Sequence, residues 1–315
     1  MPDKTVARAL EDVSFDVLPG QTVGLVGESG CGKTTTLMSV MRLLPASGRI
    51  TAGRVLFNGT DLLSLSESEM REHRWKDMAI VFQGAMNALN PVMKVGDQIR
   101  EAILLHELMD RDAAEKRVGE LLELVGITRT RRDQYPHQYS GGMRQRAMIA
   151  MALACAPDLL FADEPTTALD VMIQAQVLQL LKDIQEALGL AIVLVTHDLG
   201  VVAEVCDSVV VMYGGKVAEY ANADTIYNSP QHPYTQRLLA SFPDLNRSAE
   251  SAGLELASIP GAPPRLTQLR AGCRFEPRCH LKVEQCARIT PPLLEVAPQH
   301  YASCILREGV EANFS

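Results

Sequence analysis

No apolar run in this sequence is long enough to cross a membrane. The longest runs, such as Ala147 to Ala156, fall far short of the roughly 20 residues that a spanning helix needs. The N-terminal stretch Met1 to Arg8 also lacks the apolar core of a secretory signal peptide. We therefore expect the protein to stay in the cytosol.

Positive charge is also scarce, because 30 Lys and Arg face 38 Asp and Glu, which gives a formal net charge of −8 at pH 7. A protein whose main partner is a polyanion normally carries an excess of basic residues. The charge balance therefore disfavours nucleic acid as a partner. With 315 residues, 47% of them hydrophobic, the chain can instead form one large globular domain or two of ordinary size.

Paired cysteines are missing from the first two thirds of the chain, where Cys31, Cys155 and Cys206 each stand alone. In a cytosolic protein, single cysteines are typical of small buried side chains rather than disulfides. The other four cysteines gather near the C-terminus and indicate a site of a different kind.

One stretch, Gly27 to Thr34, fits the phosphate-loop pattern. The apolar run Thr22 to Val26 predicts a buried strand before it, and Thr34 to Leu44 predicts a helix after it. Glycines in such a loop let N–H groups and the positive helix end approach phosphate; a chance glycine-rich turn is the alternative. The candidate nucleotide-binding residues are Gly27, Glu28, Ser29, Gly30, Cys31, Gly32, Lys33, Thr34 and Thr35.

Two side chains of this loop have a specific chemistry. Lys33 is expected to reach the β- and γ-phosphates, and the hydroxyl of Thr34 to ligate Mg²⁺. Further strands are predicted at Leu10 to Val17, Arg54 to Phe57 and Met78 to Phe82. The last of these ends just before Gln83, whose amide would be well placed to touch a metal-bound water.

From Val95 to Ala156 apolar residues recur at helical spacing, which predicts an inserted helical subdomain. Within it, Ser140, Gly141 and Gly142 form a turn that opens a helix and presents a hydroxyl and N–H groups at the positive helix end. This turn is suited to an anion, but an ordinary N-cap is the alternative because Ser is a preferred capping residue.

Two adjacent carboxylates, Asp163 and Glu164, follow the buried run Leu159 to Ala162. Ligands of open α/β sheets bind at the carboxyl ends of strands, so Asp163 can contact Mg²⁺ while Glu164 orients or deprotonates water. A solvated acidic loop is the alternative. The next buried run, Leu190 to Thr196, ends at His197, which could contact a γ-phosphate or be an ordinary polar residue.

The alternation of strands and helices, including an amphipathic helix from Ile173 to Leu188, predicts an α/β fold with a mostly parallel sheet. After about residue 232 the pattern changes. Helical periodicity is mostly lost, and eight of the 17 prolines lie between Phe242 and Ser315. This predicts a separate, loop-rich module.

That module holds Cys273, Cys279, Cys286 and Cys304, with the spacing C-x5-C-x6-C-x17-C. A segment with so few core-forming residues needs something to hold it together, and a metal centre would do so. The wide spacings favour a [4Fe-4S] cluster, since structural zinc sites bring their ligands in C-x2-4-C pairs. Zn²⁺, with a histidine (His280 or His300) as a substitute ligand, and metal-free thiols are the alternatives.

Together these motifs, in their order and spacing, resemble the full motif set of an ABC-transporter ATPase. The stretches that carry the resemblance are Gly27 to Thr34, Gln83, Ser140-Gly-Gly-Met, Asp163-Glu-Pro165, Ala168-Leu-Asp170 and His197. Several shorter stretches resemble the dipeptide/oligopeptide branch and the related nickel importers, in which such a cluster is known. These stretches are Ala88-Leu-Asn-Pro91, Tyr135-Pro-His137, Gly141-Gly-Met-Arg-Gln-Arg146, Gln231-His-Pro-Tyr-Thr235 and Ile259-Pro-Gly261.

The resemblance spans the whole chain and implies a P-loop ABC-type nucleotide-binding domain over residues 1–235. This domain would have a RecA-like core with a mostly parallel sheet, an antiparallel β part and a helical subdomain at about residues 90–156. A small C-terminal module with the four cysteines would occupy residues 236–315. Two ATPase subunits, identical or paralogous, would clasp two ATP molecules head to tail, with each site built from the phosphate loop of one and the Ser140 to Gly142 turn of the other.

The resemblance also implies roles for single residues. Glu164 would be the general base and His197 the γ-phosphate sensor. Asp163 would contact Mg²⁺, Gln83 would link the nucleotide to the permease, and Asp170 would make a contact across the dimer.

The implied partners are a second ATPase subunit, two membrane permease subunits and an extracytoplasmic solute-binding protein. The ATPase would lie peripherally on the cytoplasmic face of the inner membrane, with Asp77 to Pro91 and the helical subdomain toward the permease. The sequence does not identify the solute, for which di- or oligopeptides are favoured and nickel or another small solute is the alternative.

Two rival functions belong to other classes. A soluble ABC ATPase that acts on nucleic acid or ribosomes would need a basic surface, a coiled-coil insert or tandem nucleotide domains. A scaffold that does not hydrolyse ATP would be expected to have lost Glu164 or His197, and both are present.

Two positions depart from the family pattern. The usual Leu before Ser-Gly-Gly is Tyr139, which we expect to be tolerated at a contact surface. No aromatic precedes Phe15, where the family has one that stacks on adenine. Either the true start lies further upstream or adenine is held differently.

Overall fold

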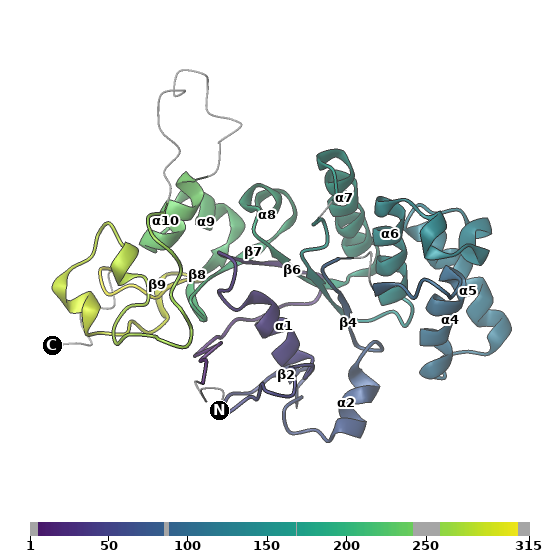
Figure 1. Cartoon of the computed structure of the whole chain (residues 1–315), viewed down its shortest axis with the longest axis horizontal. Helices are drawn as coiled ribbons and strands as arrows, with labels where there is room; N and C mark the ends of the chain where they lie inside the picture. Colours follow the sequence, from purple (N-terminus) through teal and green to yellow (C-terminus); the bar gives the residue numbers. More distant parts are fainter. Residues whose placement is uncertain (1–5, 85–87, 168, 242–258, 308–315) are drawn as a thin grey trace, which may run out of the picture. The chain divides into compact units, whose positions relative to one another are not determined.

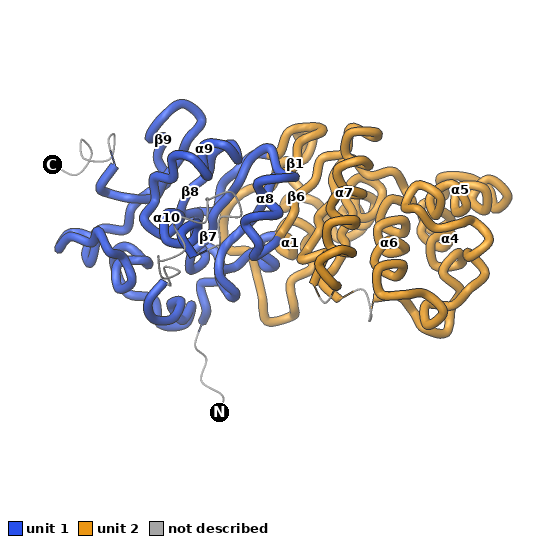
Figure 2. Tube along the Cα trace, turned by 90° about the horizontal axis from the view of Figure 1, so that it is seen from above, with its two compact units in different colours: residues 1–16, 23–36, 196–315 blue, residues 17–22, 37–195 orange. Residues whose placement is uncertain are grey.

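A computed structural model describes residues 6–84, 88–167, 169–241 and 259–307 of the chain (Figure 1). Part of the predicted permease-facing segment (85–87), Ala168 of the Ala-Leu-Asp motif, and residues 242–258 of the tail lie outside the described residues. The chain divides into two compact units (Figure 2). The first comprises residues 1–16, 23–36 and 196–315, and the second residues 17–22 and 37–195.

The first unit contains a five-stranded run of sheet in the order β1-β7-β8-β10-β9. The first two strands are parallel, with Val23 opposite Ser208, and the remaining neighbours are antiparallel. The tail therefore contributes a hairpin that extends the sheet beyond β8. The strands are β1 (Thr22–Val26), β7 (Ser208–Tyr213), β8 (Lys216–Asn222), β9 (Leu294–Ala297) and β10 (His300–Ala302).

A buried carboxylate, Glu219 on β8, fastens the tail to this sheet. It is 0% exposed, and it accepts hydrogen bonds from the N–H groups of Gln231 (2.6 Å) and His232 (2.9 Å). His300 Nε2 on β10 lies 2.7 Å from the same carboxylate. A buried carboxylate is costly unless it is fully hydrogen-bonded. The bonds to Glu219 therefore hold the segment at Gln231 and His232, and strand β10, against β8.

The helices of the first unit are mostly short. Pro233 at the first turn and the His232 side chain, which accepts from Tyr234 N–H, begin α10. This helix interrupts the loop-rich pattern that the sequence predicted after residue 232. The elements are α8 (Leu199–Val205), α9 (Ala223–Asn228), α10 (Pro233–Ala240), η4 (Glu276–Arg278) and η5 (Glu284–Ala287).

The second unit contains three parallel strands in the order β4-β5-β6. In their register Val81 lies opposite Ala162, and Asp163 lies opposite Val195. The residues that follow β4 and β5 therefore emerge at the same edge of the sheet. These strands are β4 (Met78–Val81), β5 (Leu159–Asp163) and β6 (Ala191–Thr196).

Helices fill the chain between β4 and β5, where apolar residues recur at helical spacing. Their core consists of fully buried side chains such as Ile99, Ile103 and Leu121. The helices of the unit are α2 (Glu67–His73), α4 (Val95–Leu105), α5 (Arg111–Leu124), η1 (Arg129–Asp133), η2 (Pro136–Gln138), α6 (Gly141–Ala152) and α7 (Val171–Leu188). Within the described parts of the chain, no helix is both long and apolar enough to span a membrane.

The predicted strand at Arg54 to Phe57 forms the short hairpin of β2 (Leu56–Phe57) and β3 (Thr60–Asp61). Asn58 and Gly59 make its turn at φ values of 47° and 83°. Positive φ at both central residues is what a two-residue hairpin turn requires, and Asn-Gly adopts it readily.

Two sequence predictions of local structure are wrong. The segment Leu10 to Val17 forms no strand, and Asp12 breaks its extended course at φ 51°. The helix after the phosphate loop, α1 (Lys33–Val40), ends before Leu44 because Arg42 adopts φ 52° and Leu43 N–H donates to Met38 O at 2.8 Å. That bond closes the helix with a left-handed residue, which is a common helix end.

Candidate functional site

The phosphate loop lies between β1 and α1, as its sequence context predicted. Gly27 adopts φ 146°, and a Cβ there would lie 2.2 Å from Met212 O. Gly32 adopts φ 110°, and a Cβ there would lie 2.8 Å from a Leu10 methyl. Only glycine fits these two positions, because they combine a backbone conformation foreign to other residues with direct contact to neighbouring atoms.

Lys33 is the first residue of α1 and is only 6% exposed. Its ammonium turns back across the loop and donates to Gly27 O at 2.7 Å and to Glu28 O at 3.3 Å. The positive charge is thus held against carbonyl oxygens of the loop, at the N-terminal end of α1. A phosphate is the natural anion for such a place.

The loop is also contacted by two residues that sequence reasoning missed. Tyr234 Oη accepts from Glu28 N–H at 2.9 Å, and the guanidinium of Arg278 pairs with the Glu28 carboxylate at 2.6 Å. Tyr234 belongs to the His-Pro-Tyr motif that carries part of the family resemblance, but the sequence predicted no role for it. Arg278 had no sequence signal beyond its place next to Cys279.

The predicted base, Glu164, meets Gln83 at the ends of neighbouring strands. Gln83 Nε2 donates to Glu164 Oε2 at 2.8 Å, and Thr167 Oγ1 donates to the same oxygen at 3.0 Å. Glu164 adopts φ 46°, and its N–H donates to Val195 O at 2.9 Å. A non-glycine residue in this region stores strain, so the sheet holds this carboxylate in a fixed direction.

The other predicted strand-end residues lie where expected along the chain. Asp163 is the last residue of β5 and is 3% exposed. His197 directly follows β6 and is exposed. Asp198, next to it, caps α8 by accepting from Gly200 N–H at 2.8 Å.

The Ser140 turn opens α6. Ser140 is exposed, and its hydroxyl accepts from Met143 N–H at 3.2 Å. Asp170, also exposed, caps α7 by accepting from Ile173 N–H at 3.0 Å. The two helix starts lie side by side, since a Cβ on Gly142 would come within 2.7 Å of Ile173 Cγ2. The structure thus brings together the two places predicted to contact an opposing subunit.

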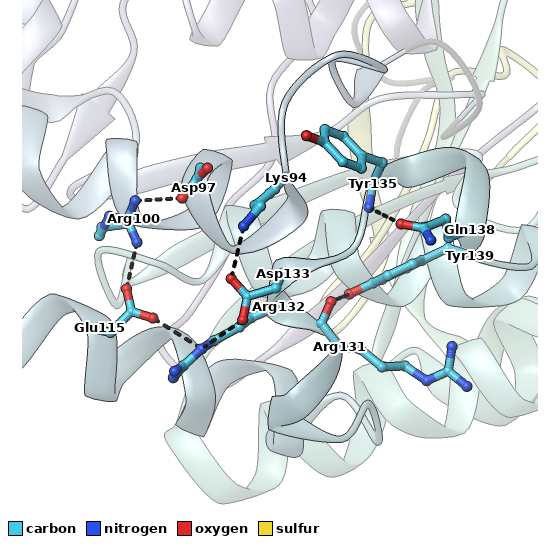
Figure 3. Close-up of polar contacts among 10 residues, drawn as sticks. All are labelled: Lys94, Asp97, Arg100, Glu115, Arg131, Arg132, Asp133, Tyr135, Gln138 and Tyr139. Carbon is cyan, nitrogen blue, oxygen red and sulfur yellow. Dashed lines mark hydrogen bonds and ion pairs between the residues drawn. The ribbon is translucent and has the colours of Figure 1, made fainter.

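Tyr139 is buried rather than at a contact surface, with 3% of it exposed. Its hydroxyl donates to Arg131 O at 3.0 Å (Figure 3), and burial raises its pKa to about 12. Tyr135 N–H donates to Gln138 Oε1 at 2.8 Å just before it. The hydroxyl of Tyr139 therefore connects the start of α6 to η1 by a hydrogen bond that a leucine could not form.

The four tail cysteines line one small cavity of about 20 Å³. Burial is the main cause of the raised pKa of Cys273, about 11, and the neighbouring thiols raise this pKa further. His232 also lines this cavity, whereas His280 and His300 are not among the lining residues. The histidines considered as substitute zinc ligands are thus placed elsewhere. The lone Cys31, Cys155 and Cys206 are buried, as predicted.

In the portion of the chain that the structure describes, no three His, Cys, Asp or Glu side chains are arranged so that they could hold a metal ion. The cavity volume also leaves space for little more than a water molecule. The four thiols therefore share a cavity without forming the tight set that a single ion needs.

Comparison with known proteins places this geometry in a family. A sequence profile described as "ABC transporter" matches residues 10–167. The chain belongs to the ABC transporter family. A second profile, described as "Oligopeptide/dipeptide transporter, C-terminal region", matches residues 218–286. This range includes α10 and three of the four clustered cysteines.

ABC-family relatives match over nearly the whole chain. The dipeptide transport ATP-binding protein DppD of Bacillus subtilis is 50% identical over 304 residues, which cover 96% of this chain and 90% of the relative. The oligopeptide transport ATP-binding protein OppD of Escherichia coli is 45% identical, covering 96% of this chain and 88% of the relative.

A solved structure of an ATP-binding cassette matches the fold. The dimeric, post-hydrolysis structure of MJ0796 bound to ADP and Pi has a TM-score of 0.61 and 29% identity, and the match covers 68% of this chain and 90% of that one. These comparisons confirm the predicted ABC-type α/β fold and the class of ATP-hydrolysing cassette. The roles of the individual site residues stay predictions.

Proposed function

We propose that this chain is the ATP-hydrolysing subunit of an importer of di- or oligopeptides and works in a head-to-tail pair with a second ATPase subunit. The observation that carries the proposal is that one chain combines the buried Lys33 of a phosphate loop with the C-terminal region of oligopeptide/dipeptide transporters. The names of the relatives, which transport peptides, support the solute class.

In this proposal the phosphate loop, Gly27 to Thr35, binds the triphosphate of ATP. Its N–H groups and Lys33 would hold the phosphates, with charge-assisted hydrogen bonds supplying most of the affinity. When bound, Mg²⁺ would neutralise charge on the β- and γ-phosphate oxygens. Thr34, Gln83 and Asp163 would hold the ion, since hydroxyl, amide and carboxylate oxygens are the ligands that Mg²⁺ prefers.

Glu164 would act as general base. Water would attack the γ-phosphorus, its proton would pass to the Glu164 carboxylate, and the bond from phosphorus to the bridging oxygen would break to release ADP. The bonds from Gln83 and Thr167 orient this carboxylate before the reaction. His197 would contact the γ-phosphate.

The second ATPase subunit would complete each site with its own Ser140, Gly141 and Gly142, and Asp170 would contact the opposing chain. Two permease subunits and an extracytoplasmic binding protein would supply the path and the solute. The ATPase would then lie on the cytoplasmic face of the inner membrane. The exposed positions of Ser140 and Asp170, on adjacent helix starts, support an intermolecular role.

We also propose that Cys273, Cys279, Cys286 and Cys304 hold a structural [4Fe-4S] cluster. Four soft thiol donors around one cavity suit iron and sulfide. The wide spacing of the four cysteines in the sequence favours the cluster over Zn²⁺, whose structural sites use close C-x2-4-C pairs.

The catalytic proposal is tested with Glu164→Gln. Phosphate release by the assembled transporter should fall at least about a hundredfold, as for loss of a general base, while ATP binding persists. The exposed Glu186 on α7 provides the matched control, and Glu186→Gln should leave turnover unchanged. Turnover near wild type in Glu164→Gln would remove this residue from the base role.

The solute is tested in vesicles that hold the whole transporter and its binding protein. Peptide should stimulate phosphate release, and Ni²⁺ should not. Stimulation by Ni²⁺ alone would transfer the chain to the nickel branch while leaving the ATPase assignment intact.

The cluster is tested on anaerobically purified protein. It should be brown and contain about four irons per chain, and Cys279→Ser should lose the iron while Cys206→Ser keeps it. Colourless protein with stoichiometric zinc, or with no metal at all, would contradict the cluster.

A further inference from the structure

A carboxylate sits inside the phosphate loop, where the expected ligand is itself strongly negative. Glu28 is the second residue of the loop, and its carboxylate is 24% exposed. An unpaired carboxylate there would repel the phosphates of ATP, since like charges close to a binding site weaken binding. The loop therefore needs something to neutralise and fix Glu28.

Arg278 supplies that neutralisation. Its two terminal nitrogens donate to the two Glu28 oxygens at 2.6 and 2.9 Å, and the arginine side chain is only 6% exposed. A two-point pair between a guanidinium and a carboxylate is directional as well as charged. It fixes the orientation of Glu28 in addition to cancelling its charge.

The arginine is itself held rigidly by the tail. Its Nε donates to Pro260 O at 2.8 Å, and its terminal nitrogens donate to Ile259 O at 3.3 Å and to Tyr213 Oη at 3.2 Å. The Ile-Pro-Gly stretch, which the sequence singled out without a role, thus provides the carbonyls that aim the guanidinium. Most N–H groups of the Arg278 guanidinium therefore donate to acceptors in the tail or in the phosphate loop.

The backbone of the same loop residue is fixed as well. Tyr234 Oη accepts from Glu28 N–H at 2.9 Å, and Tyr234 is 0% exposed. The ring of Phe275 packs edge-on against both Tyr234 and Tyr213, with centroids 5.4 and 5.1 Å apart. Phe275 lies three residues before Arg278, whose N–H donates to Phe275 O at 3.0 Å. The tail and the loop thus form one packed cluster.

We propose that Arg278 is a positioning residue for the phosphate loop, and that the C-terminal region controls ATP affinity through its pair with Glu28. The proposal rests on the proposed function, in that Gly27 to Thr35 binds ATP. Cys279 lines the cysteine cavity, and Arg278 directly precedes it. A ligand that fixes the backbone around this cavity would therefore also fix the position of Arg278. The region would then serve as part of the nucleotide site rather than only as an appendage.

The first experiment measures the dissociation constant of Mg-ATP by calorimetry on the full chain. Arg278→Gln should raise it about tenfold, equivalent to ~1.4 kcal/mol, because Glu28 is then left uncompensated. Arg278→Lys keeps the charge but not the fork, so it should recover part of the loss. The control is Arg288→Gln, which removes an exposed arginine of the same region that pairs with Glu284, and it should bind as wild type.

Lys33→Ala distinguishes a failure of the proposed role of Arg278 from a failure of the proposed ATP site. If Lys33→Ala weakens binding while Arg278→Gln binds like Arg288→Gln, the inference is overturned and the proposed function stands. If Lys33→Ala itself binds ATP normally, the phosphate-loop site is wrong and the proposed function fails first.

The second experiment needs no variant and therefore does not depend on whether Arg278→Gln folds. Coupling between two sites is reciprocal, so ATP must stabilise the segment that stabilises its loop. Hydrogen exchange on the wild-type chain should show that Mg-ATP slows the amides of Arg278 and Cys279, which donate to Phe275 O and Glu276 O. The amide of Arg288 is the internal control, and equal change at all three amides would overturn the proposal.

Discussion

Two turns in this chain each open a helix, yet they are built differently. The phosphate loop is tied to distant parts of its own unit, through Tyr234 and Arg278, and Lys33 is buried across it. The Ser140 turn is exposed and carries a local cap from Met143 N–H, three residues away. The phosphate loop is fixed by side chains far away in the sequence, whereas Ser140 itself is exposed and locally capped.

This difference indicates that the two turns bind an anion in different ways. A turn whose N–H groups are held in place loses little freedom when it binds an anion, so the phosphate loop can bind ATP within a single chain. An exposed, locally capped helix start is suited to an anion that another molecule brings to it. The comparison thus predicts that changes in the first turn alter ATP binding by the isolated subunit, whereas changes in the second leave that binding unchanged and alter hydrolysis by the assembled pair.

The largest effect is expected from a methyl group in the fixed turn. Gly27→Ala places a Cβ 2.2 Å from Met212 O at φ 146°, so the backbone itself must move. We expect a loss of about 3 kcal/mol in the free energy of unfolding, from strain and overpacking. Denaturant unfolding of the full chain measures it.

The matched change in the other turn is Gly142→Ala, whose Cβ meets the Ile173 side chain at 2.7 Å. A side chain can give way more easily than a backbone carbonyl, so the loss should be about 1 kcal/mol. Equal losses in the two variants would show that the turns are equally constrained.

The next effect concerns charge. Lys33→Ala removes the buried ammonium aimed across the loop, and ATP affinity of the isolated subunit should fall about a hundredfold, or ~2.7 kcal/mol, within the range for a charged hydrogen bond. Calorimetry measures this loss. Lys116→Ala, at an 83% exposed lysine of α5, is the control and should have no effect.

A smaller effect is expected from a single hydroxyl. Tyr234→Phe leaves the half-buried Glu28 N–H without its acceptor, and the loss of a hydrogen bond costs about 1 kcal/mol. ATP affinity should fall about fivefold, which is the same free energy expressed as binding. Tyr301→Phe makes the same change on β10, and if it weakened binding equally, the effect would not come from the loop.

Most elements near the chemistry were predictable from sequence, because buried parallel strands are continuous apolar runs. Thr22 to Val26, Leu159 to Ala162 and Leu190 to Thr196 all formed strands within a residue of the prediction. The strand predicted at Leu10 to Val17 is absent, and Asp12 at φ 51° interrupts the extended course of this segment. No local sequence pattern predicts that this aspartate adopts a positive φ.

The candidate site was predictable where its residues stand at strand ends or helix starts. The contact between Gln83 and Glu164 follows from the parallel register of β4 and β5. The pair of Glu28 with Arg278, 250 residues apart, could not be found in the same way. Periodicity and motifs report on local structure, while such a pair depends on how the tail packs back onto its unit.

The exposed turn gives the most direct test of whether the two turns have different roles. Ser140→Arg puts a bulky charge at the start of α6, and we expect the isolated subunit to bind Mg-ATP with an unchanged dissociation constant, while phosphate release by the assembled transporter is lost. Calorimetry on the variant beside wild type and Lys33→Ala provides the measurement. If Ser140→Arg weakened ATP binding by the isolated subunit as much as Lys33→Ala does, the turn would belong to its own chain's site and the division of work between the two turns would be wrong.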